Sequence, residues 1–225
     1  MVLERHQKRK SHFHYLATLK GVFGMLRSPE HTESVFDIED GLRDLDATRL
    51  AMEHVRKVPE MAALMEERYL CDVPDTEKLL DYPEGTLGYC YAHHLDDRGF
   101  DPDYYRKIDV RDDIDYVLMR LRQTHDIWHV ITGFDTDRLG EIAIKAVELA
   151  QTRRPMAAVI TTGGVLRYLR KDPEQLGSVL EMISAGYQMG IHAKLLLAQK
   201  WELGWDRPLA DWRAELNVVP YEPKG

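Results

Sequence analysis

Two histidines, an aspartate and a glutamate lie close together in the middle of the chain, within the stretch RQTHDIWHVITGFDTDRLGEIAIKA. His125, Asp126 and His129 fall within five residues, and Glu141 follows eleven positions beyond the last histidine. Histidines at positions i and i+4 of a helix project side by side and can share one divalent ion, with carboxylates completing its coordination. The spacing therefore predicts a metal site made of His125, Asp126, His129 and Glu141.

The residues around the histidines are spaced as in a helix over 112–132. The stripe places both histidines on the buried face of this helix. Its members are Ile114, Leu118, Leu121, His125, Trp128, His129 and Thr132.

A short turn separates this helix from the next, which we expect over 137–153. Gly133 is a plausible C-terminal cap, and Asp135 or Thr136 can cap the second helix. So short a turn makes the two helices antiparallel neighbours, and Glu141 then lies at the height of the histidine pair.

A metal-free alternative stays open at this point. Glu141 can instead pair with Lys145, one helical turn away on a solvated face. Asp126 is rotated by about 100° from His125 around the helix, so it is either a ligand or a partner that orients one. Against the alternative, two imidazoles and two carboxylates in a partly apolar pocket cost several kcal/mol unless a cation neutralises them.

Helical spacing of apolar residues recurs along the chain, and alternating strand patterns are absent. We therefore expect an all-α, single-domain bundle of about eight helices over 1–225, with an apolar groove or tunnel, a basic N-terminus at 1–10 and a C-terminal tail at 218–225. The helices are expected at 12–26, 34–57, 60–70, 85–98, 112–132, 137–153, 156–170 and 174–203.

Composition limits the classes of function. The chain has 225 residues, of which 44% are hydrophobic and 30% charged, enough for one buried core. Its formal charge of −8 argues against nucleic acid as a partner. The two cysteines, Cys71 and Cys90, form no metal-binding pair, and we expect reduced thiols in the cytoplasm.

The chain nowhere holds about eighteen consecutive apolar residues, the length that a membrane-spanning helix needs. Its N-terminus is basic, with Arg5, Lys8, Arg9 and Lys10 ahead of Phe13. Such a segment either lies on an anionic membrane surface or continues into a helix docked on the protein's own core.

Three segments, in this order, are similar to the ubiquinone biosynthesis family called coenzyme Q biosynthesis protein four. They are YPEGTLGYCYAHHL at 82–95, the segment at 120–151 that contains the H-D-x-x-H pattern and its glutamate, and KWELGWDRPLADWRAEL at 200–216. The resemblance covers about residues 16 to 219. Mitochondrial members carry an N-terminal targeting extension that is not seen here, so we expect a bacterial homologue or a mature form.

The resemblance implies a prenylated quinone precursor or another isoprenoid lipid as ligand, other quinone-biosynthesis proteins as partners, and a divalent metal at the four signature positions. Zinc is the metal that it implies, although iron, manganese or magnesium also suit two histidines and two carboxylates. It further implies peripheral attachment to the bacterial inner membrane, or to the matrix face of mitochondria for a mature eukaryotic form. Homo-oligomers are compatible with this assignment.

Family members are viewed both as organisers of other quinone enzymes and as catalysts that remove the ring carboxylate and hydroxylate the same carbon. We favour the catalyst. Arg122 lies three residues before His125, and its guanidinium can hold an aromatic carboxylate with two hydrogen bonds. The alternative for Arg122 is an ordinary ion pair with a nearby acid.

A prenyl chain needs an apolar wall, and small residues beside methionines in the segment 174–203 offer one. The candidate lipid-binding residues are Met182, Gly186, Met189 and Gly190. Close packing between helices explains the same small residues equally well.

Two other functions are compatible with the sequence. An HD-type phosphohydrolase would use His93 or His94 as a further metal ligand, with a metal-bound water as nucleophile. A non-catalytic lipid-binding scaffold would use the cation only to order two helices.

Overall fold

The chain is all-helical in the computed structural model, which describes residue 39, residues 41–105 and residues 107–223. Strands are absent from these residues, where the single β-bridge joins Thr86 and Pro208. The basic residues at 1–10, Phe13 and the helix expected at 12–26 lie outside the described part of the chain.

Nine α-helices form in the described residues, and three short 3₁₀ turns connect them. The helices are α3 (Asp46–Val55), α4 (Pro59–Glu67), α5 (Thr76–Leu80), α6 (Leu87–Asp96), α7 (Asp113–Thr132), α8 (Arg138–Thr152), α9 (Pro155–Lys171), α10 (Leu176–His192) and α11 (Leu209–Leu216). The 3₁₀ turns cover Pro173–Gln175, Leu196–Ala198 and Trp201–Leu203.

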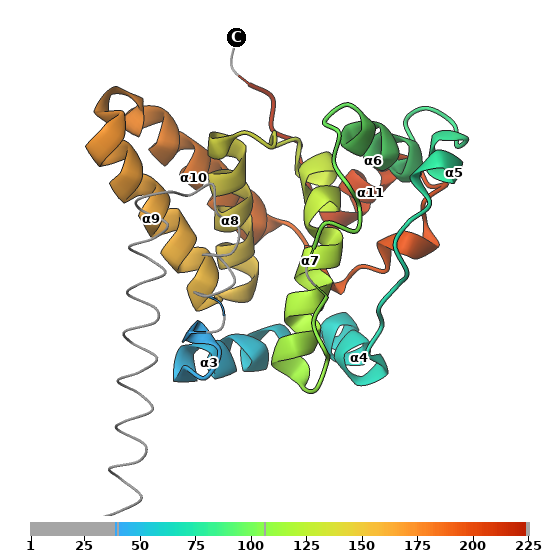
Figure 1. Ribbon diagram of the computed structural model, residues 1–225, viewed down its shortest axis with the longest axis horizontal. Coiled ribbons are helices and arrows are strands. Elements are labelled where there is room, and N and C mark those ends of the chain that lie inside the picture. The colour runs from blue at the N-terminus through green and yellow to red at the C-terminus, as the bar shows by residue number, and fades with distance from the viewer. Residues whose placement is uncertain (1–38, 40, 106, 224–225) are drawn as a thin grey trace, which may run out of the picture.

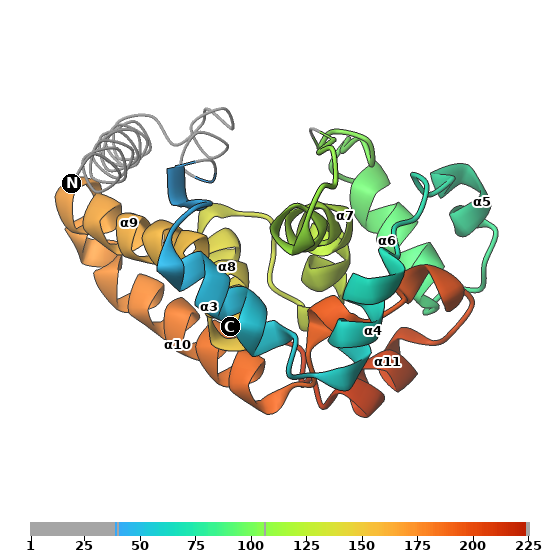
Figure 2. The same ribbon diagram turned by 90° about the horizontal axis from the view of Figure 1, so that it is seen from below.

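Helix α7 runs through the middle of the molecule (Figure 1). Helices α8, α9 and α10 lie on one side of it, and α4, α5, α6 and α11 lie on the other, an arrangement that the second view also shows (Figure 2). The main core follows from this position, because Ile127, Trp128 and Ile131 of α7 are buried against side chains from both groups. Any site on α7 is thereby held from two sides.

The helices predicted at 60–70, 85–98, 112–132, 137–153 and 156–170 are confirmed by α4, α6, α7, α8 and α9. The prediction of one helix over 34–57 is wrong, because the described residues 43–45 form a turn and Leu45 has extended backbone angles ahead of α3. The sequence analysis also missed the short helices α5 and α11.

The helix predicted over 174–203 ends at His192. A buried arginine on α7 explains why the chain leaves the helix there. Arg120 is fully buried, and its guanidinium donates to the carboxylate of Glu202 and to the carbonyl oxygen of Gln199. These contacts hold the segment after α10 against α7, so a tertiary interaction overrides the local helical pattern.

Two of the residues expected to form a lipid wall lie in the interface between α8 and α10 instead. A Cβ atom on Gly186 would lie 2.2 Å from the carbonyl oxygen of Ala143, and one on Gly190 would lie 2.9 Å from that of Val147. Both glycines therefore allow the two backbones to approach, which corrects the expectation that they face a lipid. Met182 is buried close by, and Met189 is partly buried against the core.

None of the helices in the described part of the chain has the length and apolar character needed to cross a bilayer.

We expect Gly186→Ala to lower the free energy of unfolding by about 2 kcal/mol or more, because the new methyl group meets backbone atoms of α8 that cannot move aside. Gly177→Ala is the matched control on the same helix, since a Cβ there meets nothing within 4 Å. The control should gain about 0.5–1 kcal/mol from reduced backbone entropy. Urea unfolding of the two variants measures both values, and equal stabilities would contradict the packing described here.

Candidate metal centre

The turn between α7 and α8 sets the position of the candidate ligands. Gly133 ends α7 in the left-handed conformation, with φ +76°, and its amide donates to the carbonyl oxygen of His129 at 2.9 Å. The cap of α8 is Asp137, whose carboxylate accepts from the amide of Gly140 at 2.7 Å. The prediction of Asp135 or Thr136 as this cap was therefore one or two residues early, whereas the prediction for Gly133 is confirmed.

Gly140 allows the turn to close tightly. A Cβ atom at this position would lie 1.8 Å from the carbonyl oxygen of Asp135. Arg98 on the far side of the turn adds two contacts, to the hydroxyl of Thr136 at 3.0 Å and to the carboxylate of Asp135 at 2.8 Å. The turn is therefore fixed at both of its ends, and Glu141 follows it immediately.

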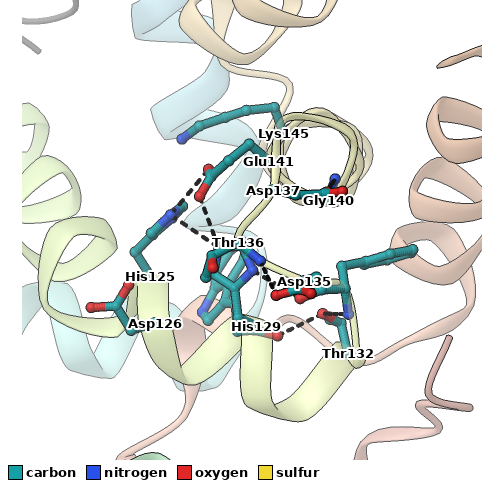
Figure 3. A network of polar contacts seen from close by, with 12 residues as sticks. His125, Asp126, His129, Thr132, Asp135, Thr136, Asp137, Gly140, Glu141 and Lys145 are labelled. Carbon is teal, nitrogen blue, oxygen red and sulfur yellow. Dashed lines mark hydrogen bonds and ion pairs between the residues drawn. The ribbon is translucent and has the colours of Figure 1, made fainter. Parts of the chain in front are cut away.

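Three of the four predicted ligands converge (Figure 3). The Nε2 atoms of His125 and His129 are 3.2 Å apart. The two carboxylate oxygens of Glu141 lie 3.3 Å from these nitrogens, one oxygen on each histidine. A single point between the three side chains is thus within reach of two nitrogens and a carboxylate.

His129 is oriented by its own backbone turn. Its Nδ1 atom lies 2.9 Å from the carbonyl oxygen of Phe134, to which it donates as N–H. In the neutral ring this leaves the lone pair of Nε2 directed at the other two ligands, an arrangement typical of metal-binding histidines. Burial lowers the pKa of His129, but the adjacent Glu141 carboxylate outweighs it, so the pKa lies above the usual value.

Glu141 is held ionised by the same neighbours. Burial opposes its charge, but His125 and His129 hold the pKa of the Glu141 carboxyl far below its usual value. A carboxylate that stays charged next to two imidazoles is a suitable donor for a divalent cation.

The separations between the donor atoms fit a metal ion. Four ligands placed tetrahedrally at about 2.0–2.1 Å from one ion lie about 3.3 Å from one another. The 3.2 Å between the Nε2 atoms of His125 and His129 matches this value, and each carboxylate oxygen of Glu141 lies 3.3 Å from one of these nitrogens. Three protein ligands also leave a coordination position for a substrate atom or water, as in catalytic sites.

Asp126, the fourth predicted ligand, does not join the group. It is buried, and its carboxylate points away from the histidines (Figure 3). Its Oδ1 accepts a hydrogen bond of 3.2 Å from the hydroxyl of Tyr105. The ring of Tyr105 meets that of His125 edge-on, with 6.2 Å between the centroids. The rotation of about 100° between consecutive residues of a helix explains why Asp126 points elsewhere, and its contact with the histidines is indirect, through Tyr105.

The histidines that an HD-type phosphohydrolase would need lie outside this group. His93 is exposed and pairs with Asp97 at 2.9 Å. His94 stacks on the far side of His129, with the ring centroids 6.0 Å apart, and burial lowers its pKa to about 4. The described residues thus give the phosphohydrolase hypothesis no upstream ligand.

A cavity of about 410 Å³ adjoins the candidate metal centre, and His125 and Glu141 form part of its wall. It lies between α7, α8 and α9, and much of its lining is apolar. The apolar lining residues are Leu121, Trp128, Ile142, Ile144, Ile160, Gly163, Gly164 and Tyr168. Its volume is in the range of about 300–1,000 Å³ that small-molecule sites occupy.

A chain of ion pairs runs along one wall of the cavity. Lys145 and Arg154 both bind the carboxylate of Glu148, at 2.8 and 2.7 Å. Arg154 also binds Glu39 at 2.9 Å, and the other oxygen of Glu39 binds Arg122 at 2.6 Å. Arg122, predicted to hold a substrate carboxylate, is thus already paired with a carboxylate of the protein.

The sequence analysis missed the contribution of α9 to the cavity. Gly163 and Gly164 stand in the middle of this helix, where each glycine costs about 1 kcal/mol relative to alanine. This pair was the available signal, because such a cost in a helix interior indicates a packing or binding requirement. The sequence analysis considered only the small residues of α10, and these do not line this cavity.

Comparisons with known proteins agree with this architecture. The family profile described as Coenzyme Q (ubiquinone) biosynthesis protein Coq4 matches residues 42–222. The chain belongs to the Coq4 family. The matched region includes the turn between α7 and α8 and all three converging ligands.

Individual Coq4 relatives extend the comparison. The mitochondrial ubiquinone biosynthesis protein COQ4 homologue of Mus musculus is 33% identical over 172 residues, and that of Xenopus tropicalis is 31% identical over 178 residues. These matches cover 75% and 77% of this chain but only 64% and 62% of the relatives. The chain therefore spans less than two thirds of the length of either relative.

A crystal structure of a Nostoc punctiforme protein, provisionally named a ubiquinone biosynthesis protein, has the same fold. The two structures superpose with a TM-score of 0.82 at 37% sequence identity. The match covers 89% of this chain and 96% of the Nostoc chain.

We expect His129→Ala and Glu141→Ala to abolish stoichiometric metal binding, whereas Asp126→Asn should retain about one ion per chain with a roughly 10- to 100-fold weaker affinity, the usual effect of altering an orienting partner. Elemental analysis after dialysis, followed by competition with a chelator, separates the two classes. Asp126 would prove to be a direct ligand if its variant lost as much metal as His129→Ala.

Glu148→Gln should lower the free energy of unfolding by about 3–5 kcal/mol, because Arg154 and Lys145 then lose a buried partner. Glu53→Gln is the control, since its ion pair with Arg49 is exposed and contributes under about 1 kcal/mol. Denaturant unfolding at neutral pH measures both, and similar losses for the two variants would contradict a buried role for Glu148.

The destabilisation caused by Glu148→Gln should also depend on pH. Burial opposes the charge of Glu148, but Lys145 and Arg154 lower its pKa from 4.5 to about 2. A depressed pKa in the folded protein stabilises it above pH 4.5, and this stabilisation is lost as the pH falls towards 2. The difference between wild type and variant should therefore be largest above pH 4.5 and shrink below it, and a constant difference would refute the assignment.

Proposed function

We propose that this protein acts in ubiquinone biosynthesis, where it binds a divalent cation through His125, His129 and Glu141 and removes the ring carboxylate of a prenylated hydroxybenzoate held in the adjoining cavity. One observation carries this proposal: His125 and Glu141 belong both to the cluster of donor atoms and to the cavity wall. A ligand in the cavity would therefore lie against the candidate metal centre. The names of the Coq4 relatives support the pathway.

The reaction breaks the bond between the ring carbon and the carboxylate, and carbon dioxide leaves. The ring carbon then takes a proton. In an oxidative form it takes a hydroxyl group from water instead, while dioxygen accepts two electrons and two protons and leaves as hydrogen peroxide. A divalent cation at this position supplies Lewis-acid stabilisation of negative charge on a ring oxygen or carboxylate.

The protein's own side chains orient the ligand and keep water out. Trp128, Leu121 and Ile144 present apolar surface to an aromatic ring and the start of its prenyl chain. Tyr105 also lines the cavity, and burial and the charge of Asp126 raise the pKa of its hydroxyl, which therefore keeps its proton at neutral pH. That proton is donated to Asp126, so the hydroxyl holds the loop that carries Tyr105 beside His125.

We place the protein at a membrane surface, in contact with other quinone-biosynthesis proteins. This placement is supported by large apolar side chains on α9 and α10, each of which has between 43% and 54% of its surface exposed. They are Leu166, Leu169, Leu180, Tyr187 and Ile191. Such a surface also suits extraction of an insoluble substrate from a bilayer.

Incubation of the metal-loaded protein with a farnesylated 4-hydroxybenzoate tests the reaction. Wild type should release carbon dioxide and the decarboxylated phenol or hydroquinone, detected by mass spectrometry, whereas His129→Ala and chelated wild type should release neither. Binding of the compound without turnover in aerobic metal-loaded wild type would refute catalysis and support the non-catalytic lipid-binding scaffold.

A further inference from the structure

The face of α9 that lines the cavity carries one positively charged side chain, that of Arg167. Ile160, Gly163, Gly164, Arg167 and Tyr168 follow one another at helical spacing and all contribute to the wall. Gly163 and Gly164 lie one helical turn before Arg167 on the same face of α9, and both belong to the cavity wall without contributing a side chain.

The other cations of the wall already have partners. Arg122, Lys145 and Arg154 are paired with Glu39 and Glu148, and Arg138 is engaged as well. Arg167 is half-buried, and within the described part of the chain it makes no hydrogen bond or ion pair. A guanidinium that borders an apolar cavity without a partner indicates that an anion from outside the protein completes it.

Arg167 lies at the level of the metal centre. The connection between α8 and α9 is only two residues long, so the helices are antiparallel neighbours. A Cβ atom on Gly164 would meet the side chain of Ile142 at 2.8 Å, and Ile142 directly follows Glu141. Arg167 lies three residues beyond Gly164, in the direction of the start of α8, so both groups border the same end of the cavity.

We propose that Arg167 binds the anionic head group of the ligand, as a bidentate partner for a carboxylate or phosphate. This inference rests on the proposed function, because it assumes that a prenylated ligand enters this cavity. Arg167 thus takes the role that the sequence analysis gave to Arg122, because the guanidinium of Arg122 is paired with Glu39. The apolar lining would bind the acid and its decarboxylated product alike, so Arg167 supplies the discrimination between them.

Calorimetric titration with three probes tests this role: farnesylated 4-hydroxybenzoate, the corresponding farnesylated phenol without the carboxylate, and farnesyl monophosphate. Arg167→Gln should weaken binding of the carboxylate probe by about ten- to a hundred-fold, the usual effect of losing a charge-assisted pair, and leave the phenol unchanged. Arg167→Lys should recover only part of the loss, because lysine keeps the charge without the planar fork.

Arg170→Gln is the matched control, since Arg170 lies on the same helix, is exposed and does not line the cavity. It should bind all three probes as wild type does. Metal content and thermal unfolding of each variant, measured alongside, show whether the site and the fold are intact.

The results separate the two proposals. A larger loss for the carboxylate or for the phosphate probe identifies the natural head group, and either result supports the anion site. Equal losses for acid and phenol, or no loss at all, overturn the role of Arg167. Arg167-dependent binding without turnover leaves the anion site standing while the proposed reaction fails, and absence of binding to wild type overturns both.

Discussion

The short turn between α7 and α8 is the constraint on which the candidate site depends. Histidines one turn apart on a helix need a third donor from elsewhere, and the turn supplies it by folding Glu141 back to their height. Gly133 provides the left-handed residue that ends α7, and Gly140 permits the contact with Asp135 that a side chain would prevent. The carbonyl of Phe134, within the turn, then fixes the ring of His129. One local structure thus positions two of the donors.

The charged side chains along one wall of the cavity differ from those at the metal centre in the partners that they contact. Along one wall, Lys145, Glu148, Arg154, Glu39 and Arg122 neutralise one another, so the desolvation cost of each is offset by protein partners. At the metal centre the Nε2 atoms of the two imidazoles and the carboxylate of Glu141 lie against one another. The first arrangement stabilises the fold, whereas the second leaves binding capacity for a cation. The partners of the charged side chains therefore distinguish a structural chain of ion pairs from a candidate binding site, whereas the residue types alone do not.

The sequence predicted local features well. The helical stripe through His125 and His129, the cap at Gly133 and the approach of Glu141 all follow from spacing within one helix and one turn. Features set by contacts between distant residues could not be predicted from the sequence. No local pattern shows that Arg120 binds the carbonyl oxygen of Gln199, a contact that accompanies the end of α10 at His192. For the same reason, the pairing of Arg122 with a residue far along the chain, and the role of glycines on α9 rather than α10, required the folded structure.

All three converging donors come from α7 and α8, two helices joined by a short turn, so the donors are also close together in the sequence. Closing a short turn costs little chain entropy, so α7 and α8 can bring the donors together before more distant segments arrive. The cavity, in contrast, needs α9 and Glu39 as well. If the cation binds as we propose, a partly folded chain can therefore hold it before the cavity has formed. Such early binding would reduce the additional stability that the cation gives to the finished protein.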